Sequence, residues 1–157
     1  MIRQAVDSDM PEAYFTEPLR TEQIGHQKWK IIRGFAFQSK TGRRVYVPKG
    51  FECDLASIPS ALQSFVSKVG YWSQGAVVHD LLYANHRNGI DIVITRLEAD
   101  RLLREGCTVK VNQWNVPRSE RRTKLIYSAV RLGGLESWET PKEREERLNM
   151  MNAYTEE

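Results

Sequence analysis

The pattern His79-Asp80-x-x-Tyr83, followed by Asp100, contains the residue types best suited to chemistry in this sequence. Positions four residues apart share one face of an α-helix, so His79 and Tyr83 point the same way, while Asp80 is turned by about 100°. Asp100 falls within the apolar stripe of the next expected helix. We therefore expect the four side chains to meet in one buried polar site between two packed helices.

A buried carboxylate such as Asp100 is costly unless it is hydrogen-bonded or paired, and the His79 imidazole and the Tyr83 hydroxyl are its candidate partners. Asp100 would then fix the tautomer of His79 and leave the other ring nitrogen to take a proton from water, as a general base does. Asp80, aimed differently, is a candidate ligand for a hard divalent cation, with Asp54 as a further oxygen donor.

The same residues also have interpretations that involve no chemistry. A buried polar network can fix how two helices pack without any catalysis. Asp54 can serve as a loop or helix-capping residue, and His86 as a surface histidine near a helix end. Both interpretations of the cluster stay open on the sequence alone.

The elements expected to position these residues make an α+β fold. Residues 29–37 and 44–47 are rich in aromatic and β-branched side chains and flank a turn, so they predict a β-hairpin or small antiparallel sheet packed on a mainly helical core. Capping residues and apolar spacing predict about four helices, over residues 61–69, 73–89, 95–104 and 119–133. Gly106 is expected to stop the third helix, with a short strand over residues 108–111 after it.

Length and composition indicate one domain with two extensions. The 157 residues suffice for a single core, and we expect an N-terminal arm over residues 1–27, a globular domain over 28–134 and a helical tail over 135–157. The formal charge of +3 is too small and too dispersed to favour nucleic-acid binding. No run approaches the roughly 20 apolar residues of a transmembrane segment, and the N-terminus does not resemble a signal peptide.

The run His79-Asp80-Leu81-Leu82-Tyr83, followed by Ala99-Asp100, resembles the signature of parvovirus capsid phospholipases and secreted phospholipases A. The resemblance implies that His79 activates water, that Asp80 holds calcium, and that Asp100 orients the histidine with support from Tyr83. It covers only residues 78–103, and the Gly-rich calcium loop of those families has only the stretch 70–75 as its counterpart here.

A longer resemblance rests on five motifs in order, at residues 47–51, 54–59, 79–83, 99–100 and 129–134. They are similar to the motifs of a bacteriophage and prophage family catalogued as domain of unknown function 1353. This resemblance implies a phage origin and no assigned activity.

Two functional hypotheses follow. In the first, the protein is a phage hydrolase that is made in the host cytoplasm, is carried in the virion, and uses His79 to attack a lipid ester of the host envelope. In the second, it is a non-catalytic virion component, such as a tail or baseplate adaptor. Its termini would then bind other phage virion proteins or a second copy of the chain, and its polar cluster would be structural.

Overall fold

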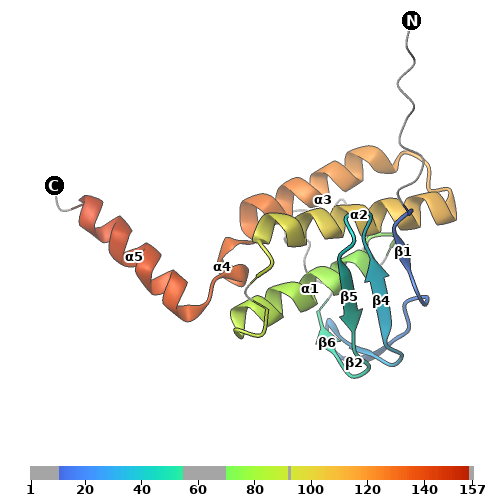
Figure 1. Cartoon of the computed structure of the whole chain (residues 1–157), viewed down its shortest axis with the longest axis horizontal. Helices are drawn as coiled ribbons and strands as arrows, with labels where there is room; N and C mark the ends of the chain where they lie inside the picture. The colour runs from blue at the N-terminus through green and yellow to red at the C-terminus, as the bar shows by residue number, and fades with distance from the viewer. Residues whose placement is uncertain (1–10, 55–69, 92, 156–157) are drawn as a thin grey trace, which may run out of the picture.

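The computed structural model describes residues 11–54, 70–91 and 93–155 of the chain, and the helix expected over 61–69 lies outside them. The described residues form an α+β fold, as the sequence predicts (Figure 1). The strands are β1 (Tyr14–Phe15), β2 (Thr21–Gly25), β3 (Lys28–Ile31), β4 (Phe35–Gln38), β5 (Arg44–Val47) and β6 (Glu52–Cys53). The helices are α1 (Ser73–Arg87), α2 (Arg96–Trp114), α3 (Ser119–Gly133), α4 (Leu135–Trp138) and α5 (Pro141–Thr155).

The strands form two antiparallel three-stranded sheets, in the orders β1-β4-β5 and β2-β3-β6. The expected hairpin is formed by β4 and β5, but the single strand expected over residues 29–37 is wrong, because the chain passes there from one sheet to the other. Gly34 permits the crossing, since a Cβ at this position would lie 2.7 Å from the Tyr46 hydroxyl and 3.1 Å from the Val47 carbonyl oxygen. Residues 11–27, expected as an arm or an irregular strand, contribute β1 and β2.

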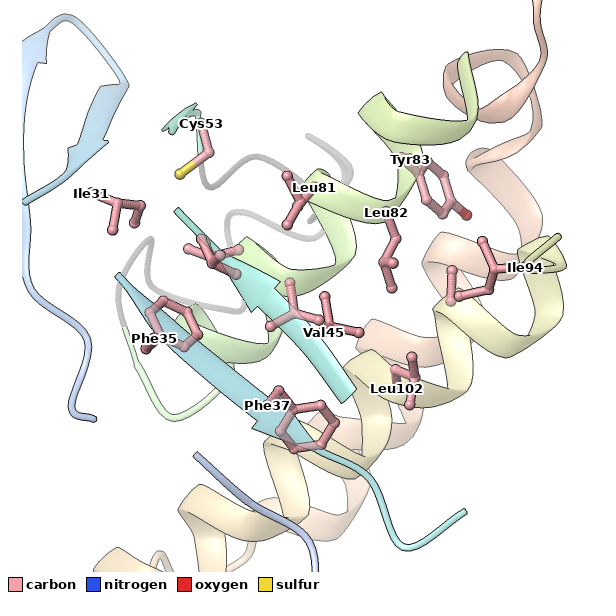
Figure 2. Packing of buried hydrophobic residues seen from close by; sticks show 14 of the residues in the cluster. Ile31, Phe35, Phe37, Val45, Cys53, Leu81, Leu82, Tyr83, Ile94 and Leu102 are labelled. Carbon is pink, nitrogen blue, oxygen red and sulfur yellow. The ribbon is translucent and has the colours of Figure 1, made fainter. Parts of the chain in front are cut away.

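The main apolar core lies between the sheets and helices α1 and α2, as Figure 2 shows. Its strand side chains include Phe35, Phe37 and Val45, and its helix side chains include Leu81, Leu82 and Leu102. A second apolar cluster joins α1, α2 and α3, with α2 in the middle. Helix α1 is buried around most of its circumference.

Helix α2 is longer than the sequence predicts. The expected stop at Gly106 and the expected strand over 108–111 are both wrong, because α2 continues to Trp114. Gly106 is a point of close helix packing: a Cβ there would lie 3.1 Å from the Cα of Gly75 on α1 and 3.1 Å from the Phe15 ring. Packing against α1 and β1 thus overrides the weak strand preference of the β-branched residues that follow.

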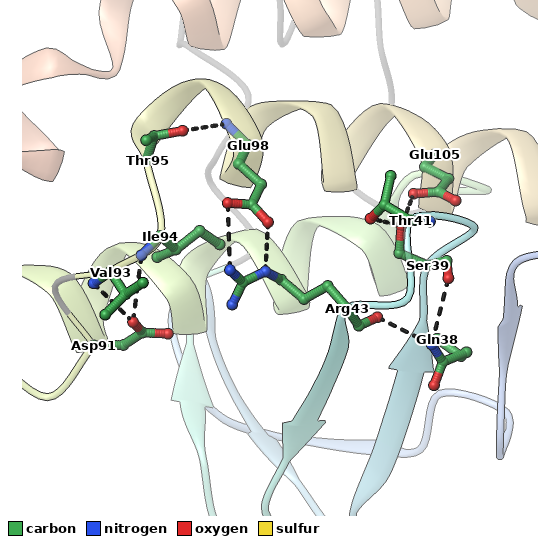
Figure 3. Close-up of polar contacts among 10 residues, drawn as sticks. All are labelled: Gln38, Ser39, Thr41, Arg43, Asp91, Val93, Ile94, Thr95, Glu98 and Glu105. Atoms are coloured by element: carbon green, nitrogen blue, oxygen red, sulfur yellow. Dashed lines mark hydrogen bonds and ion pairs between the residues drawn. The ribbon is translucent and has the colours of Figure 1, made fainter.

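The β4–β5 hairpin is fastened to α2 by side-chain contacts (Figure 3). The Arg43 guanidinium donates to the Glu98 carboxylate, and the Ser39 hydroxyl and the Lys40 backbone N–H each donate to Glu105 at 2.7 Å. At the start of α2, the Thr95 hydroxyl accepts the Glu98 backbone N–H at 3.1 Å, which confirms the expected cap.

The C-terminal helix α5 extends away from the rest of the molecule (Figure 1). Its first turns are fastened to the preceding residues: Arg147 donates to both carboxylate oxygens of Glu139, at 2.7 and 3.1 Å, and Thr140 and Glu143 cap the helix reciprocally. No helix in the described part of the chain has the length and apolar character needed to cross a membrane.

Candidate functional site

Asp100 on α2 is the centre of the polar site. Its side chain is fully buried and accepts hydrogen bonds from three other side chains. His79 Nε2 and the Tyr83 hydroxyl lie 2.7 and 2.5 Å from Oδ1, and Arg131 Nη1 lies 2.6 Å from Oδ2. Helices α1, α2 and α3 therefore each contribute to one network, and the structure brings together His79, Tyr83 and Asp100 as the sequence predicts.

These contacts keep Asp100 ionised. Burial by itself raises the pKa of this carboxyl group, but the hydrogen bonds from His79, Tyr83 and Arg131 together lower it by more, so its pKa lies below the ordinary value. Burial raises the pKa of the Tyr83 phenol, and the Asp100 carboxylate raises it further. Tyr83 therefore keeps its proton, and its O–H donates a hydrogen bond to Asp100.

An ionised carboxylate can only accept, so His79 donates its Nε2–H to Asp100. The neutral imidazole then has its lone pair on Nδ1, which is buried and has no hydrogen-bond partner among the described residues. The ring lies 4.0 Å from that of Tyr83 between centroids, which fixes its plane. The pair thus presents an oriented acceptor nitrogen, as a general base requires.

His79 also lines a cleft of about 800 Å³. Helix α1 lines this cleft together with residues 26–28 and 51–54 and the C-terminal end of α3. Asp80 and Asp54 lie on the same cleft, so the structure places both expected metal ligands near the histidine. The cleft is therefore bordered by the imidazole and by two carboxylates.

The described residues do not make a complete metal site. Among them, no group of three or more His, Cys, Asp or Glu side chains is arranged to hold a metal ion. Calcium takes six to eight oxygen ligands, and two carboxylates fall short of that number. We therefore assign no step of the chemistry below to a cation.

Arg131 is the member of the site that sequence reasoning missed. It occurs in the motif at 129–134, but an arginine on a helix surface is ordinarily solvated, and nothing local indicates a buried partner. Its backbone carbonyl oxygen accepts a hydrogen bond from Arg96 of α2 at 2.9 Å, which holds the end of α3 beside Asp100. Gly134, in the same motif, leaves room for Tyr83, because a Cβ there would lie 2.8 Å from its hydroxyl oxygen.

The expectation that His86 is a surface residue is wrong. Its side chain is buried, because the Trp138 indole of α4 stacks on it with ring centroids 3.9 Å apart and planes 11° from parallel. The indole of Trp138 also meets the Tyr83 ring edge to face, at 5.0 Å between centroids. The expectation failed because α4 covers the last turns of α1, a contact that no local pattern reveals.

In a comparison with protein families, the family described as Protein of unknown function (DUF1353) matches residues 29–130. The matched segment contains His79, Tyr83 and Asp100 and ends at the residue before Arg131. Comparisons with curated proteins and with solved structures found no match.

Proposed function

Since the chain belongs to the DUF1353 family, whose description assigns no activity, we propose its function from the polar site: ester hydrolysis with His79 as the general base. The observation that carries the proposal is the state of the imidazole. Asp100 binds Nε2, while Nδ1 is buried in a ring that lines a cleft and has no partner among the described residues. Nδ1 of His86 is likewise buried without a partner among the described residues, so it is the position of His79 on the cleft, together with its bond to Asp100, that distinguishes it.

The proposed reaction needs water and an ester. Nδ1 of His79 takes a proton from a water molecule as the water oxygen attacks the acyl carbon. The acyl carbon–oxygen bond then breaks, and the proton on Nδ1 passes to the departing alkoxide, which leaves an acid and an alcohol. Asp100 stabilises the imidazolium formed in between, because its charge lies 2.7 Å from Nε2.

We propose as substrate a lipid ester of a bacterial envelope, and as setting a bacteriophage particle. The phospholipase-like spacing of His79, Asp80, Tyr83 and Asp100 supports the substrate class, and the order of the phage-family motifs supports the setting.

The test uses ester release from p-nitrophenyl esters and from phosphatidylglycerol vesicles. His79→Gln is expected to lower kcat by about 10²- to 10⁴-fold, the range of general-base contributions. Asp100→Asn is expected to do the same, because an amide can present its N–H to Nε2 and favour the wrong tautomer. Glu98→Gln, an acid-to-amide change on the same helix but outside the cleft, serves as the matched control and is expected to keep full activity.

Circular dichroism of each variant must show a folded protein for the comparison to count. Wild-type protein that is folded and turns over none of these esters would contradict the proposal, and so would a His79→Gln variant of unchanged rate.

The divalent cation at Asp80 and Asp54 is a separate proposal, supported by the position of both carboxylates on the cleft. Calorimetric titration of Ca²⁺ into wild type and Asp80→Asn tests it. Binding to wild type that is lost in the variant would support the site, and absence of binding to wild type would remove it.

A second function is supported by α5. This helix extends from the body and exposes Leu148, Met150 and Met151, three apolar side chains that a partner could cover (Figure 1). We propose, as the alternative, a virion component whose C-terminal helix binds a neighbouring subunit. In that case truncation of residues 141–157 prevents particle assembly, whereas His79→Gln is tolerated.

A further inference from the structure

We propose that Trp138 is a positioning residue that couples the attachment of α5 to the His79–Asp100 pair. The proposal rests on the proposed function only because that function gives the His79–Asp100 pair its catalytic role. Trp138 is buried on α4, where it stacks on the ring of His86 and meets the ring of Tyr83 edge to face. It thus contacts the polar site through Tyr83, and residues next to it contact the outer helix.

The inner half of the link runs through Tyr83. Its ring is in contact with Trp138 at 5.0 Å and with His79 at 4.0 Å between centroids. Its hydroxyl donates to Oδ1 of Asp100, the same oxygen that accepts Nε2–H of His79. A movement of Trp138 therefore changes the donors that share this oxygen, and with them the hydrogen bond of the histidine.

The outer half of the link runs through α5. Glu139, the residue after Trp138, is buried and receives two hydrogen bonds from Arg147 of α5. His86, which stacks on Trp138, lies 3.3 Å from the Glu143 carboxylate at the start of α5. Glu139, which follows Trp138 in the chain, and His86, which stacks on its indole, are therefore both held by the first turns of α5.

Helix α4 cannot hold Trp138 in place unaided. It spans only Leu135–Trp138, and a helix of one turn has little stability of its own. The indole therefore depends on its contacts with α1 and on the contacts that Glu139 and His86 make with α5, so a partner that reorients α5 would move it. Binding at the outer helix and the state of His79 are linked in this way without a direct contact between them.

The experiment measures NMR signals of the full-length protein. Two resonances are followed: the imidazole Nε2–H of His79, assigned by its absence in His79→Gln, and the indole N–H of Trp138, assigned by its absence in Trp138→Phe. Arg147→Ala removes the clamp on Glu139 and is expected to shift both resonances. Lys142→Ala is the matched control, because its ion pair with Glu146 stays within α5, and it is expected to shift neither.

Substitution of the indole gives the second readout. Trp138→Ala is expected to shift the His79 resonance, and Trp138→Phe, which keeps an aromatic ring against Tyr83, is expected to restore it in large part. The proposal is overturned if Arg147→Ala moves the indole signal but leaves His79 unchanged, or if it moves neither. Since no readout is an activity, a protein without esterase activity can still show the coupling, and an active esterase can still lack it.

Discussion

The carboxylates of helix α2 bind other elements in two environments, one at the surface and one in the protein interior. Glu98 and Glu105 face the β4–β5 hairpin at the surface, where the Glu98 side chain is 35% exposed and its partner Arg43 is 31% exposed (Figure 3). Asp100, two residues after Glu98, is turned to the opposite side of the helix and is fully buried. One helix therefore fastens the sheet with one face and organises the polar site with the other.

The two faces of α2 differ in whether water can solvate their carboxylates, and this distinguishes a structural contact from a candidate site. The Arg43–Glu98 pair joins groups that water can also solvate, so the Glu98 carboxylate would be satisfied without its partner. At Asp100, water is excluded and the protein supplies every donor, yet the same network leaves Nδ1 of His79 without a partner among the described residues. The hydrogen bonds to Asp100 fix the His79 ring, and Nδ1 of that ring can still accept a proton. For these two reasons the buried face of α2 is a candidate for chemistry.

Removal of Asp100 is expected to have the largest effect. Asp100→Ala leaves buried hydrogen-bond donors of His79 and Tyr83 without an acceptor, and we expect the free energy of unfolding to fall by about 3–5 kcal/mol. Glu98→Ala, the same change on the exposed face, is expected to cost about 1 kcal/mol or less. Urea unfolding measures both values, and equal losses would abolish the distinction between the faces.

Acid is expected to act on the buried face next. The hydrogen bonds to Asp100 hold its pKa below the ordinary 3.8, so its contribution to stability is present above that pH and is lost as the pH falls through the lowered folded-state value. Wild type is therefore expected to lose stability below about pH 4 more steeply than Asp100→Asn, which has no carboxyl group to titrate. Thermal unfolding of both proteins between pH 2 and 6 tests this, and parallel curves would contradict it.

Gly134→Ala is expected to have an intermediate effect that reaches the site through packing. The added Cβ would lie 2.6 Å from the Val130 carbonyl oxygen and 2.8 Å from the Tyr83 hydroxyl, so the phenol must move away from Asp100. We expect a loss of about 1–3 kcal/mol, as for other overpacked positions. Gly25→Ala is the control, because its Cβ would meet only the Cβ of Lys28 at an ordinary 3.6 Å. Urea unfolding distinguishes the two variants, and equal stabilities would contradict the crowding.

The helix-borne part of the site was predictable from sequence because helical spacing is regular. His79 and Tyr83 recur on one face of α1, and a carboxylate within an apolar stripe of α2 requires donors, so their meeting follows from local patterns. Arg131 and Trp138 were not predictable in the same way. Each comes from an element whose position depends on how the chain folds back after α2, which no spacing encodes.

The fold was predictable to a similar extent. The α+β class and the β4–β5 hairpin followed from composition and turn residues. The role of Gly106 was not predictable, because a glycine that ends a helix and one that lets two helices approach look alike in sequence. The division of residues 29–37 between two sheets was missed because Gly34 serves a contact with β5, which is distant along the chain.

The smallest effect is expected in the coupling energies of two arginine–carboxylate pairs whose acidic residues lie on α2. Arg43–Glu98 and Arg131–Asp100 have arginine side chains that are each 31% exposed, so the pairs differ mainly in the carboxylate, 35% exposed in one and fully buried in the other. Double-mutant cycles with Met for Arg and Ala for the acid give the coupling energy of each pair. For Arg43–Glu98 we expect at most about 1 kcal/mol, and a further decrease in 1 M salt, where the screening length is about 3 Å. For Arg131–Asp100 we expect a larger coupling that salt changes less, because water and ions do not reach Oδ2. Equal salt dependence of the two coupling energies would mean that solvent enters the polar site. The two faces of α2 would then not differ in kind in their access to solvent.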